Sequence, residues 1–397
     1  MSEWREVSLG EITNKIGSGA TPKGGGESYK ETGISLIRSQ NVLDFKFGIK
    51  GLAFIGDTQA YELRSVAVEQ NDVLLNITGD SVARCCVVPE AILPARVNQH
   101  VAIIRANKQI ADNNYIFYSL QALKEELLMQ SEIGATRNAL TKGMIESLKI
   151  SIPSLEEQKS IASVLSSLDD KIDLLHRQNT TLERMAETLF RQWFVEEAQE
   201  DWEEKRIGDL VKVIDNRGKT PPYTDIPSLC PLIEVNALTG NNRLVDYSVI
   251  RKFVDEQTFK TWFRGHPKKY DSLISTVGSI GEISMFLVEK GSIAQNVIAL
   301  SAVNICPVYL FEALKNIKDE IKELDIGSVQ PSIKVPHLLS LKIKIPSKDK
   351  IDNFSVIVKS YLEKMIVNYQ QILTLEKLRD NLLPKLMSGE VRVDSTQ

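Results

Sequence analysis

The sequence predicts an α+β protein built from two related globular domains, each followed by a long helix. Three observations support this fold class: an internal repeat, a heptad pattern of apolar residues after each copy, and short strand-like runs within each copy. A chain of 397 residues is long for one hydrophobic core and suits two domains. The two helices should pair as an antiparallel coiled coil, which gives a pseudo-two-fold internal repeat.

The repeat is clearest near the end of each copy. Residues 133–154 and 326–347 align without gaps at an offset of 193, with nine identities in 22 positions. Shorter matches join Leu9-Gly10-Glu11-Ile12 to Ile207-Gly208-Asp209-Leu210, Gly19-Ala20-Thr21-Pro22 to Gly218-Lys219-Thr220-Pro221, residues 72–79 to 271–278, and Asn98-Gln99-His100-Val101 to Ala294-Gln295-Asn296-Val297. A period of nearly 200 residues is too long for a solenoid unit, so the pattern indicates a duplicated domain.

Each copy is followed by a heptad pattern that predicts a long helix. Residues 155–197 contain no proline or glycine, and Ser154 with Glu157 forms a capping-box signature at the start. The same register recurs 193 residues later and should end near Pro384. The predicted coiled-coil seam consists of Leu165, Leu168, Ile172, Leu175, Asn179, Leu182, Leu189, Val358, Tyr361, Met365, Asn368, Ile372, Leu375 and Leu382.

The boundaries follow from these patterns. We expect a first domain at residues 1–153, a central long helix at 154–200, a second domain at 201–346, and a C-terminal long helix and tail at 347–397. Antiparallel pairing would hold the two domains apart on a stiff spacer, about 58 Å long at ~1.5 Å per residue. Each seam carries one asparagine, which is either a solvated position or half of a polar pair that fixes the register.

Within the domains, short apolar runs predict strands and longer ones predict helices. Strands are expected at residues 34–38, 73–77, 84–88 and 101–105, and at 232–235, 272–276, 282–288 and 297–303. Helices are expected at residues 113–130 and 308–323. Residues 17–26 and 217–224 are rich in Gly, Pro and Thr and should form exposed loops.

The composition excludes several classes of protein. With 43% hydrophobic and 25% charged residues the chain is neither disordered nor fibrous, and no run is long enough for a membrane span. The polar start lacks a secretory signal, so a cytoplasmic protein without membrane contact is expected. Four cysteines and four histidines lie at spacings that predict neither a disulfide framework nor a metal site.

Charge is unevenly distributed along the chain. Residues 15–50 have a balance of +3 and residues 205–270 of +5, whereas residues 155–204 have a balance of −8. Charge runs often mark solvated faces, but basic loops at matching places in both domains also suit a polyanion. Two basic domains on a rigid spacer would fit DNA, in which one groove face recurs every ~34 Å.

Motifs that resemble catalytic sites are incomplete. Gly218-Lys219-Thr220 lacks the first P-loop glycine because residue 213 is Val213, and Gly17-Ser18-Gly19 has Pro22 in place of a third glycine. Thr220-Pro221-Pro222-Tyr223 resembles an amino-methyltransferase motif, but one hydroxyl cannot replace the amide or carboxylate that accepts the hydrogens of the target amine. No catalytic residue is therefore predicted, and the chain reads as a non-catalytic recognition protein.

Several segments together resemble a known family. They are Ile152-Pro153 with Glu157-Gln158, Ile161, Leu165, Asp169, Ile172, Leu182 and Leu189-Phe190, the closing residues 382–390, and Gly19-Ala20-Thr21-Pro22. Across essentially the whole chain this pattern resembles the DNA-specificity subunit of type I restriction–modification systems.

The resemblance implies two target-recognition domains, each reading half of a split DNA site. It implies helices that set the gap between half-sites and dock two modification subunits, which bind S-adenosylmethionine and methylate adenine at N6. Restriction motor-nuclease subunits would join them, while this chain would hold no cofactor or metal. One departure is Lys350-Ile351 where the first copy has Glu157-Gln158, which would make the two docking sites unequal.

Side-chain chemistry selects the candidate DNA contacts, because Arg, Lys, Asn and Gln suit base edges and Lys, Thr and Tyr suit phosphates. The candidates are Lys23, Arg38, Asn41, Arg84, Asn98, Arg137, Lys219, Tyr223, Asn236, Arg243 and Asn296. Gln99 and Gln295 occupy matching places, which favours a shared structural role as much as a DNA contact. Two other functions stay open: a coiled-coil adaptor that never reads DNA, and a self-contained modification enzyme.

Overall fold

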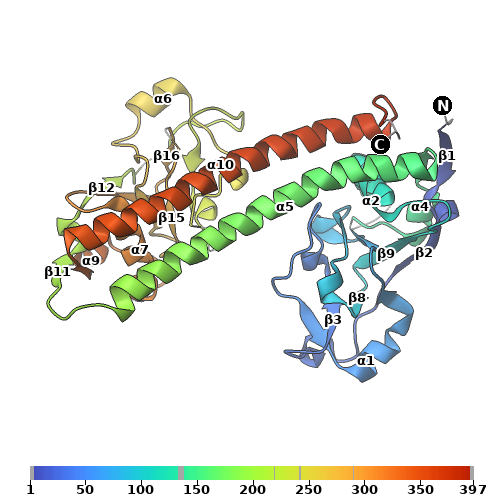
Figure 1. Ribbon diagram of the computed structural model, residues 1–397, viewed down its shortest axis with the longest axis horizontal. Helices are drawn as coiled ribbons and strands as arrows, with labels where there is room; N and C mark the ends of the chain where they lie inside the picture. The colour runs from blue at the N-terminus through green and yellow to red at the C-terminus, as the bar shows by residue number, and fades with distance from the viewer. Residues whose placement is uncertain (1–3, 133–137, 219, 241–242, 289, 394–397) are drawn as a thin grey trace. The chain divides into compact units, whose positions relative to one another are not determined.

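The computed structural model describes residues 4–132, 138–218, 220–240, 243–288 and 290–393 (Figure 1). The chain forms two compact units. The first unit comprises residues 1–174 and 371–397, and the second unit comprises residues 175–370. Each unit therefore contains one globular domain and a segment of each long helix. No helix in the described part of the chain is long and apolar enough to cross a membrane.

The first unit is built on an antiparallel sheet with the order β2-β9-β6-β7. Its strands are β2 (Thr13–Ser18), β9 (Val101–Ala106), β6 (Val73–Asn76) and β7 (Cys85–Val87). A second sheet has the order β4 (Ala53–Ile55), β3 (Ile34–Ile37), β8 (Ala95–Val97) and β5 (Ala67–Val68). The remaining elements are β1 (Arg5–Ser8), which pairs with β10 (Lys149–Ile152), and α1 (Asp57–Glu62), α2 (Asn113–Ala122), α3 (Lys124–Glu132) and α4 (Lys142–Ser147).

The second unit repeats this topology, with the strand order β12-β17-β14-β15. Its strands are β12 (Val211–Asp215), β17 (Val297–Ala302), β14 (Ser272–Ser275) and β15 (Ile283–Met285). The other elements are β11 (Glu203–Arg206), which pairs with β18 (Lys342–Ile345), β13 (Leu232–Ile233), which pairs with β16 (Ser292–Ile293), and α6 (Glu256–Thr261), α7 (Pro307–Asn316), α8 (Lys318–Glu323) and α9 (Val335–Ser340). The parallel β13–β16 pair matches the parallel β3–β8 pair, so the duplication extends to the smaller sheet.

The prediction of one helix at 113–130 and one at 308–323 is wrong, because each region forms two short helices. The breaks lie at Leu123 (φ −93°, ψ 14°) and Ile317 (φ −101°, ψ 22°). Beyond each break the next helix still buries an apolar residue, Leu127 in α3 and Ile321 in α8. Neither break contains proline or glycine, so the sequence held no local signal for it.

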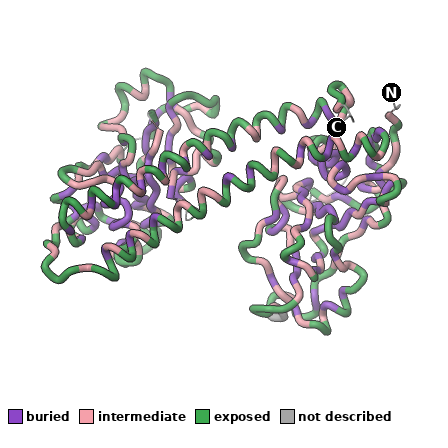
Figure 2. Tube along the Cα trace, in the orientation of Figure 1, coloured by how far each residue is buried: buried purple, intermediate pink, exposed green. Residues whose placement is uncertain are grey.

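Two long helices cross both units: α5 (Leu155–Arg191), which continues as a π-helical turn at Gln192–Glu196, and α10 (Lys348–Met387). Figure 2 shows buried positions recurring along both helices. Leu165 packs into the same core cluster as Leu386 in the first unit, and Ala186 into the same cluster as Leu362 in the second. Helix α10 continues past Pro384 and ends before Gly389. Gly389 has a φ of 76°, in the left-handed region that glycine adopts without strain at the end of a helix.

Polar residues interrupt the apolar seam at defined positions. In the second unit, Asn368 Nδ2 donates to Asn179 Oδ1 at 2.8 Å, so the two seam asparagines contact each other. In the first unit, Arg379 Nη1 donates to Asp169 Oδ1 at 2.9 Å, and Tyr118 donates to the other carboxylate oxygen at 2.6 Å. Because a partner is needed for each buried polar group, these contacts favour one register of the two helices.

The starts of the two helices share a cap but differ in the neighbouring contact. Glu157 N donates to Ser154 Oγ at 3.3 Å, and Lys350 N donates to Ser347 Oγ at 3.4 Å. In the first unit the indole of Trp4 donates to Glu157 at 3.3 Å, whereas in the second the Lys350 ammonium lies 5.3 Å from the ring centroid of Trp202. The substitution of lysine for glutamate therefore keeps a tryptophan contact at this position while reversing the charge.

Candidate nucleic-acid interface

Three loop segments form the same backbone framework in both units. In the first unit the three segments follow β6, precede β9 and precede α4. In the second unit they follow β14, precede β17 and precede α9. In the first unit, Ile77 N donates to His100 O at 3.0 Å, Gly79 N to Asn138 O at 3.1 Å and Leu140 N to Ile77 O at 2.8 Å. In the second unit the equivalent bonds join Thr276 N to Asn296 O at 2.9 Å, Gly278 N to Pro331 O at 3.0 Å and Ile333 N to Thr276 O at 2.8 Å. The duplication thus preserves the backbone on which different side chains stand.

In the first unit the loops after β6 and before β9, together with the loop after β2, carry a chain of four hydrogen-bonded side chains. Thr21 Oγ1 donates to Gln99 Oε1, and Gln99 Nε2 lies 3.0 Å from His100 Nε2. The other imidazole nitrogen lies 2.6 Å from Thr78 Oγ1. The loop before Thr21 is held close to the sheet because Gly19 N donates to Asn98 O, and a Cβ at Gly19 would overlap Val97 O at 1.7 Å. Gln99 is exposed, so this polar chain ends at the surface.

In the second unit the loop before β17, the loop after β12 and the β13 region line an open hollow of 360 Å³. Thr220, Gln295 and Asn296 line it, together with Asn236 and Lys252. Lys252 is held by Glu234 at 2.8 Å, and its ammonium lies 4.9 Å from the centroid of the exposed Tyr223 ring. The hydrogen bond from Lys252 to Glu234 raises the pKa of this lysine and keeps it cationic. Amide, hydroxyl and ammonium donors therefore converge on one concave surface.

Two further hollows of the second unit continue along the same chain segment. One of 290 Å³ is lined by Asn216, Arg217, Trp262 and Arg264, among others. The next, of 850 Å³, shares Arg264 and adds three lysines: Lys212, Lys268 and Lys269. Asp215 and Asp271 also line that hollow, so the surface is mixed with an excess of cations. A row of donors, cations and an exposed indole matches what a nucleic-acid backbone and its bases require.

The candidate residues of the first unit have different environments. Lys23 is exposed and lies 3.8 Å from Glu62, and Arg84 is half-buried. Arg38 is half-buried and donates to Gly51 O at 2.6 Å. Asn41 and Asn98 are buried: Asn41 accepts from Arg38 N at 3.1 Å and donates to Gly48 O at 2.8 Å, and Asn98 accepts from His100 N at 3.0 Å. These two asparagines shape loops from within, while Arg137 lies outside the described residues.

In the second unit the structure brings together Asn236 and Asn296, which line one hollow beside Lys252. Arg243 does not join them. Its side chain is 1% exposed and is paired with the equally buried Glu312, and it donates to Glu183 O at 3.2 Å. Burial therefore removes Arg243 from the candidate surface, because a base contact needs a side chain that reaches solvent. Lys219 lies outside the described residues.

Sequence reasoning missed four residues that the loops place at the two surfaces: Thr21, His100, Thr220 and Lys252. A usable signal existed for Thr21 and Thr220, because the Gly-x-Thr-Pro segment occurs in both copies. The equivalent glutamines, Gln99 and Gln295, were identified as matching positions, and both are exposed. No comparable signal marked Lys252, whose position depends on the fold of the β13 region.

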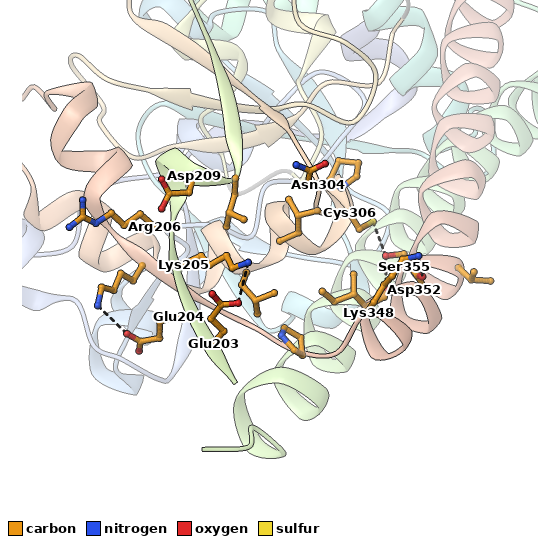
Figure 3. Close-up of a pocket in the computed structure, with 18 of the residues that line it drawn as sticks. Glu203, Glu204, Lys205, Arg206, Asp209, Asn304, Cys306, Lys348, Asp352 and Ser355 are labelled. Atoms are coloured by element: carbon orange, nitrogen blue, oxygen red, sulfur yellow. Dashed lines mark hydrogen bonds and ion pairs between the residues drawn. The ribbon is translucent and has the colours of Figure 1, made fainter. Parts of the chain in front are cut away.

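A further hollow, of 1130 Å³, lies elsewhere in the second unit, between the β11–β18 pair and the start of α10 (Figure 3). Its lining alternates acidic and basic groups, and Ser355 Oγ lies 2.8 Å from Cys306 Sγ. No histidine lines it, and the described residues contain no group of three or more His, Cys, Asp or Glu side chains arranged for a metal. The first unit offers no better candidate in Cys86. Burial raises the pKa of the Cys86 thiol to about 12, so this thiol is a poor nucleophile at neutral pH.

The fold and the interface together define a class: a duplicated α+β protein with loop surfaces suited to nucleic acid and long paired helices. The family model of the type I restriction modification DNA specificity domain matches residues 1–184 and 199–377. The chain therefore belongs to the family of type I restriction–modification specificity subunits, as the sequence resemblance indicated.

Individual relatives agree. The chain is 29% identical over 307 residues to the type I restriction enzyme MjaIX specificity subunit of Methanocaldococcus jannaschii, covering 71% of this chain and 70% of that protein. It is 22% identical over 484 residues to the HindI specificity subunit of Haemophilus influenzae, covering 98% and 100%. The crystal structure of a type I S subunit from M. genitalium aligns with a TM-score of 0.62 at 16% identity, covering 97% of this chain and 96% of that one, which supports the shared fold.

Proposed function

We propose that each globular domain of this subunit reads one half of a bipartite DNA target. The observation that carries the proposal is the repeated loop framework. Equivalent backbone bonds hold the same three segments in both units, while residues at matching positions, such as His100 and Asn296, differ. A duplicated framework with diverged side chains suits two different half-sites on one DNA molecule.

The long helices would serve two roles in the assembled enzyme. They set the number of base pairs between the half-sites, and they dock two modification subunits. Those subunits bind S-adenosylmethionine and methylate adenine at N6, and restriction motor-nuclease subunits complete the complex. This chain contributes recognition without chemistry, consistent with the incomplete P-loop, dinucleotide and amino-methyltransferase motifs of its sequence.

The two domains are diverged copies, so the target should be asymmetric. Of the 22 positions in the best-conserved stretch, nine are identical, and the candidate contact residues lie mostly outside this set. We expect two different half-sites separated by a fixed gap. Identical half-sites in inverted orientation would contradict this expectation.

The decisive experiment is single-molecule mapping of N6-methyladenine in the host genome with and without this gene. Loss of methylation at one gapped motif establishes recognition and gives both half-sites at once. If genome methylation is unchanged, the next experiment is to co-express the chain with its neighbouring modification subunit in a methylation-free host. A complex that forms but methylates no motif and binds no DNA would favour the adaptor role instead.

A further inference from the structure

An exposed threonine and an exposed glutamine lie at matching positions in both domains, outside either core. In the first unit Thr21 Oγ1 donates to Gln99 Oε1 across two loops. The equivalent residues of the second unit, Thr220 and Gln295, line the same 360 Å³ hollow. Gln99 and Gln295 are both exposed. Ordering an exposed glutamine costs side-chain entropy, so the Thr21–Gln99 contact, with the same two residue types kept in the second unit, points to an external ligand.

The neighbours of the pair do not recur. His100, which lies 3.0 Å from Gln99 Nε2, corresponds to Asn296, and Thr78, which lies 2.6 Å from His100, corresponds to Val277. Equivalent backbone hydrogen bonds in both units hold the loops that carry the glutamine and its two variable neighbours. The threonine and glutamine are therefore constant on a framework whose adjoining positions vary.

We propose that the Thr21–Gln99 and Thr220–Gln295 pairs each bind a phosphate of the DNA backbone, an inference that rests on the proposed function. Two different half-sites share the sugar–phosphate backbone and differ in their bases, so the residues common to both domains should contact the backbone. Base discrimination then falls to the variable positions beside the pair, His100 and Asn296.

The remaining hydrogen-bonding capacity of Gln99 agrees with this assignment. Thr21 occupies one lone pair of the amide oxygen, and His100 faces the amide nitrogen. One amide hydrogen remains for an outside acceptor at the exposed end of the side chain. Phosphate oxygens only accept hydrogen bonds, and glutamine and threonine are common neutral ligands for them. The threonine fixes the amide orientation, so its role is to position the glutamine.

The test uses the full chain assembled with its modification subunits. Gln99→Ala and Gln295→Ala are compared with Gln109→Ala and Gln257→Ala, which remove exposed glutamines elsewhere in the same units. Affinity is measured by fluorescence anisotropy on a duplex with the mapped motif and on one of unrelated sequence. Each test variant should bind both duplexes roughly tenfold more weakly, because a hydrogen bond to a charged group is lost. The methylated motif should stay unchanged, and the controls should bind like the wild type.

Gln99→Glu provides a second variant that keeps the size of the side chain and places a carboxylate against the phosphate. It should weaken binding further than Gln99→Ala, with an unchanged melting temperature. A motif relaxed at one base position in Gln99→Ala would overturn the proposal in favour of a base contact. Unchanged affinity in Gln99→Ala and Gln295→Ala would overturn it in favour of a loop-shaping role. A wild-type complex that binds neither duplex would instead refute the proposed function.

Discussion

At the scale of single residues, Arg243 shows how burial changes the meaning of a charged side chain. Its guanidinium is paired with Glu312 and lies 5.4 Å from the centroid of the Phe311 ring. Burial lowers the pKa of Arg243 to about 10, while Glu183 and Glu187 act in the opposite direction, so the side chain stays cationic at neutral pH. An enclosed pair of this kind is costly to break, because removing one partner leaves the other charge uncompensated.

Replacing Arg243 should therefore affect stability and leave recognition intact. Arg243→Leu is expected to lower the free energy of unfolding by about 3–5 kcal/mol, and Arg243→Leu with Glu312→Leu should recover most of it. Urea denaturation of both variants measures the effect. Methylation mapping of the double variant should return the wild-type motif. A changed half-site with normal stability would restore Arg243 as a DNA contact.

Glu282 is a second residue whose charge is structural. Burial disfavours its ionisation, but Lys318 at 2.8 Å and Lys322 at 3.1 Å outweigh that cost and hold the pKa below its usual value. A depressed native pKa means that the ion pairs stabilise the fold above the unfolded-state pKa. That stabilisation is lost as the pH falls through the native pKa.

Glu282→Gln should thus lower stability by about 1 kcal/mol at pH 7. The gap between wild type and variant should close under acidic conditions, where both side chains are neutral. Thermal denaturation of the two proteins across pH 3–7 at constant ionic strength follows the gap. A difference that persists unchanged at the acidic end would show that packing, and not charge, accounts for it.

At the scale of elements, the two helices match polar groups to polar groups. At the offset of 193, Asp169 corresponds to Leu362, and Arg379 to Ala186. The first unit thus carries a charged pair at the site where the second unit buries an apolar one. The Arg379 guanidinium also lies 3.7 Å from the centroid of the Phe45 ring, which joins the helix to a loop of its own domain.

Because the second unit has Leu362 and Ala186 at the matching positions, the internal repeat suggests a double variant that tests the Asp169–Arg379 pair. Asp169→Leu alone should lower the free energy of unfolding by about 2 kcal/mol, because Arg379 loses its 2.9 Å partner Asp169 and keeps the more exposed Asp380. Asp169→Leu with Arg379→Ala copies the second unit and should recover part of that loss. Urea denaturation of the wild type, both single variants and the double variant closes the cycle. Strictly additive losses would show that the two side chains do not interact.

At the scale of the whole molecule, the outer faces of the helices bear on assembly. Val356 and Val367 of α10 are 72% and 45% exposed, and 11 residues make about three helical turns, so both lie on one face. An exposed apolar face on a helix is suited to a protein partner. Within the proposed function that partner is a modification subunit.

Val356→Asp with Val367→Asp should reduce co-purification of a modification subunit by at least tenfold, since two buried carboxylates would each cost several kcal/mol. The matched control is Val329→Asp, which changes a valine that is 99% exposed in the loop between α8 and α9. Analytical size-exclusion chromatography of the co-expressed proteins reports the stoichiometry. Normal assembly of the helix variant would place the docking surface elsewhere.

The duplication, the heptad seams and the incompleteness of the catalytic motifs could all be predicted from the amino-acid sequence. These features depend on spacing along the chain, which is fully visible in the sequence, and the equivalent sheets of the two units confirm the repeat. Helical periodicity also placed Asn179 and Asn368 on the seams, where each was either a solvated residue or half of a polar pair. The hydrogen bond between them supports the polar pair.

Which polar residues reach the surface could be seen only in the folded chain. Arg243 has the side-chain chemistry of a DNA contact, yet the distant residues Glu312 and Glu183 hold it in the interior, whereas Thr21 and Gln99 meet across 78 residues at an exposed site. Burial depends on what packs against a side chain from elsewhere in the chain, and no local pattern records it.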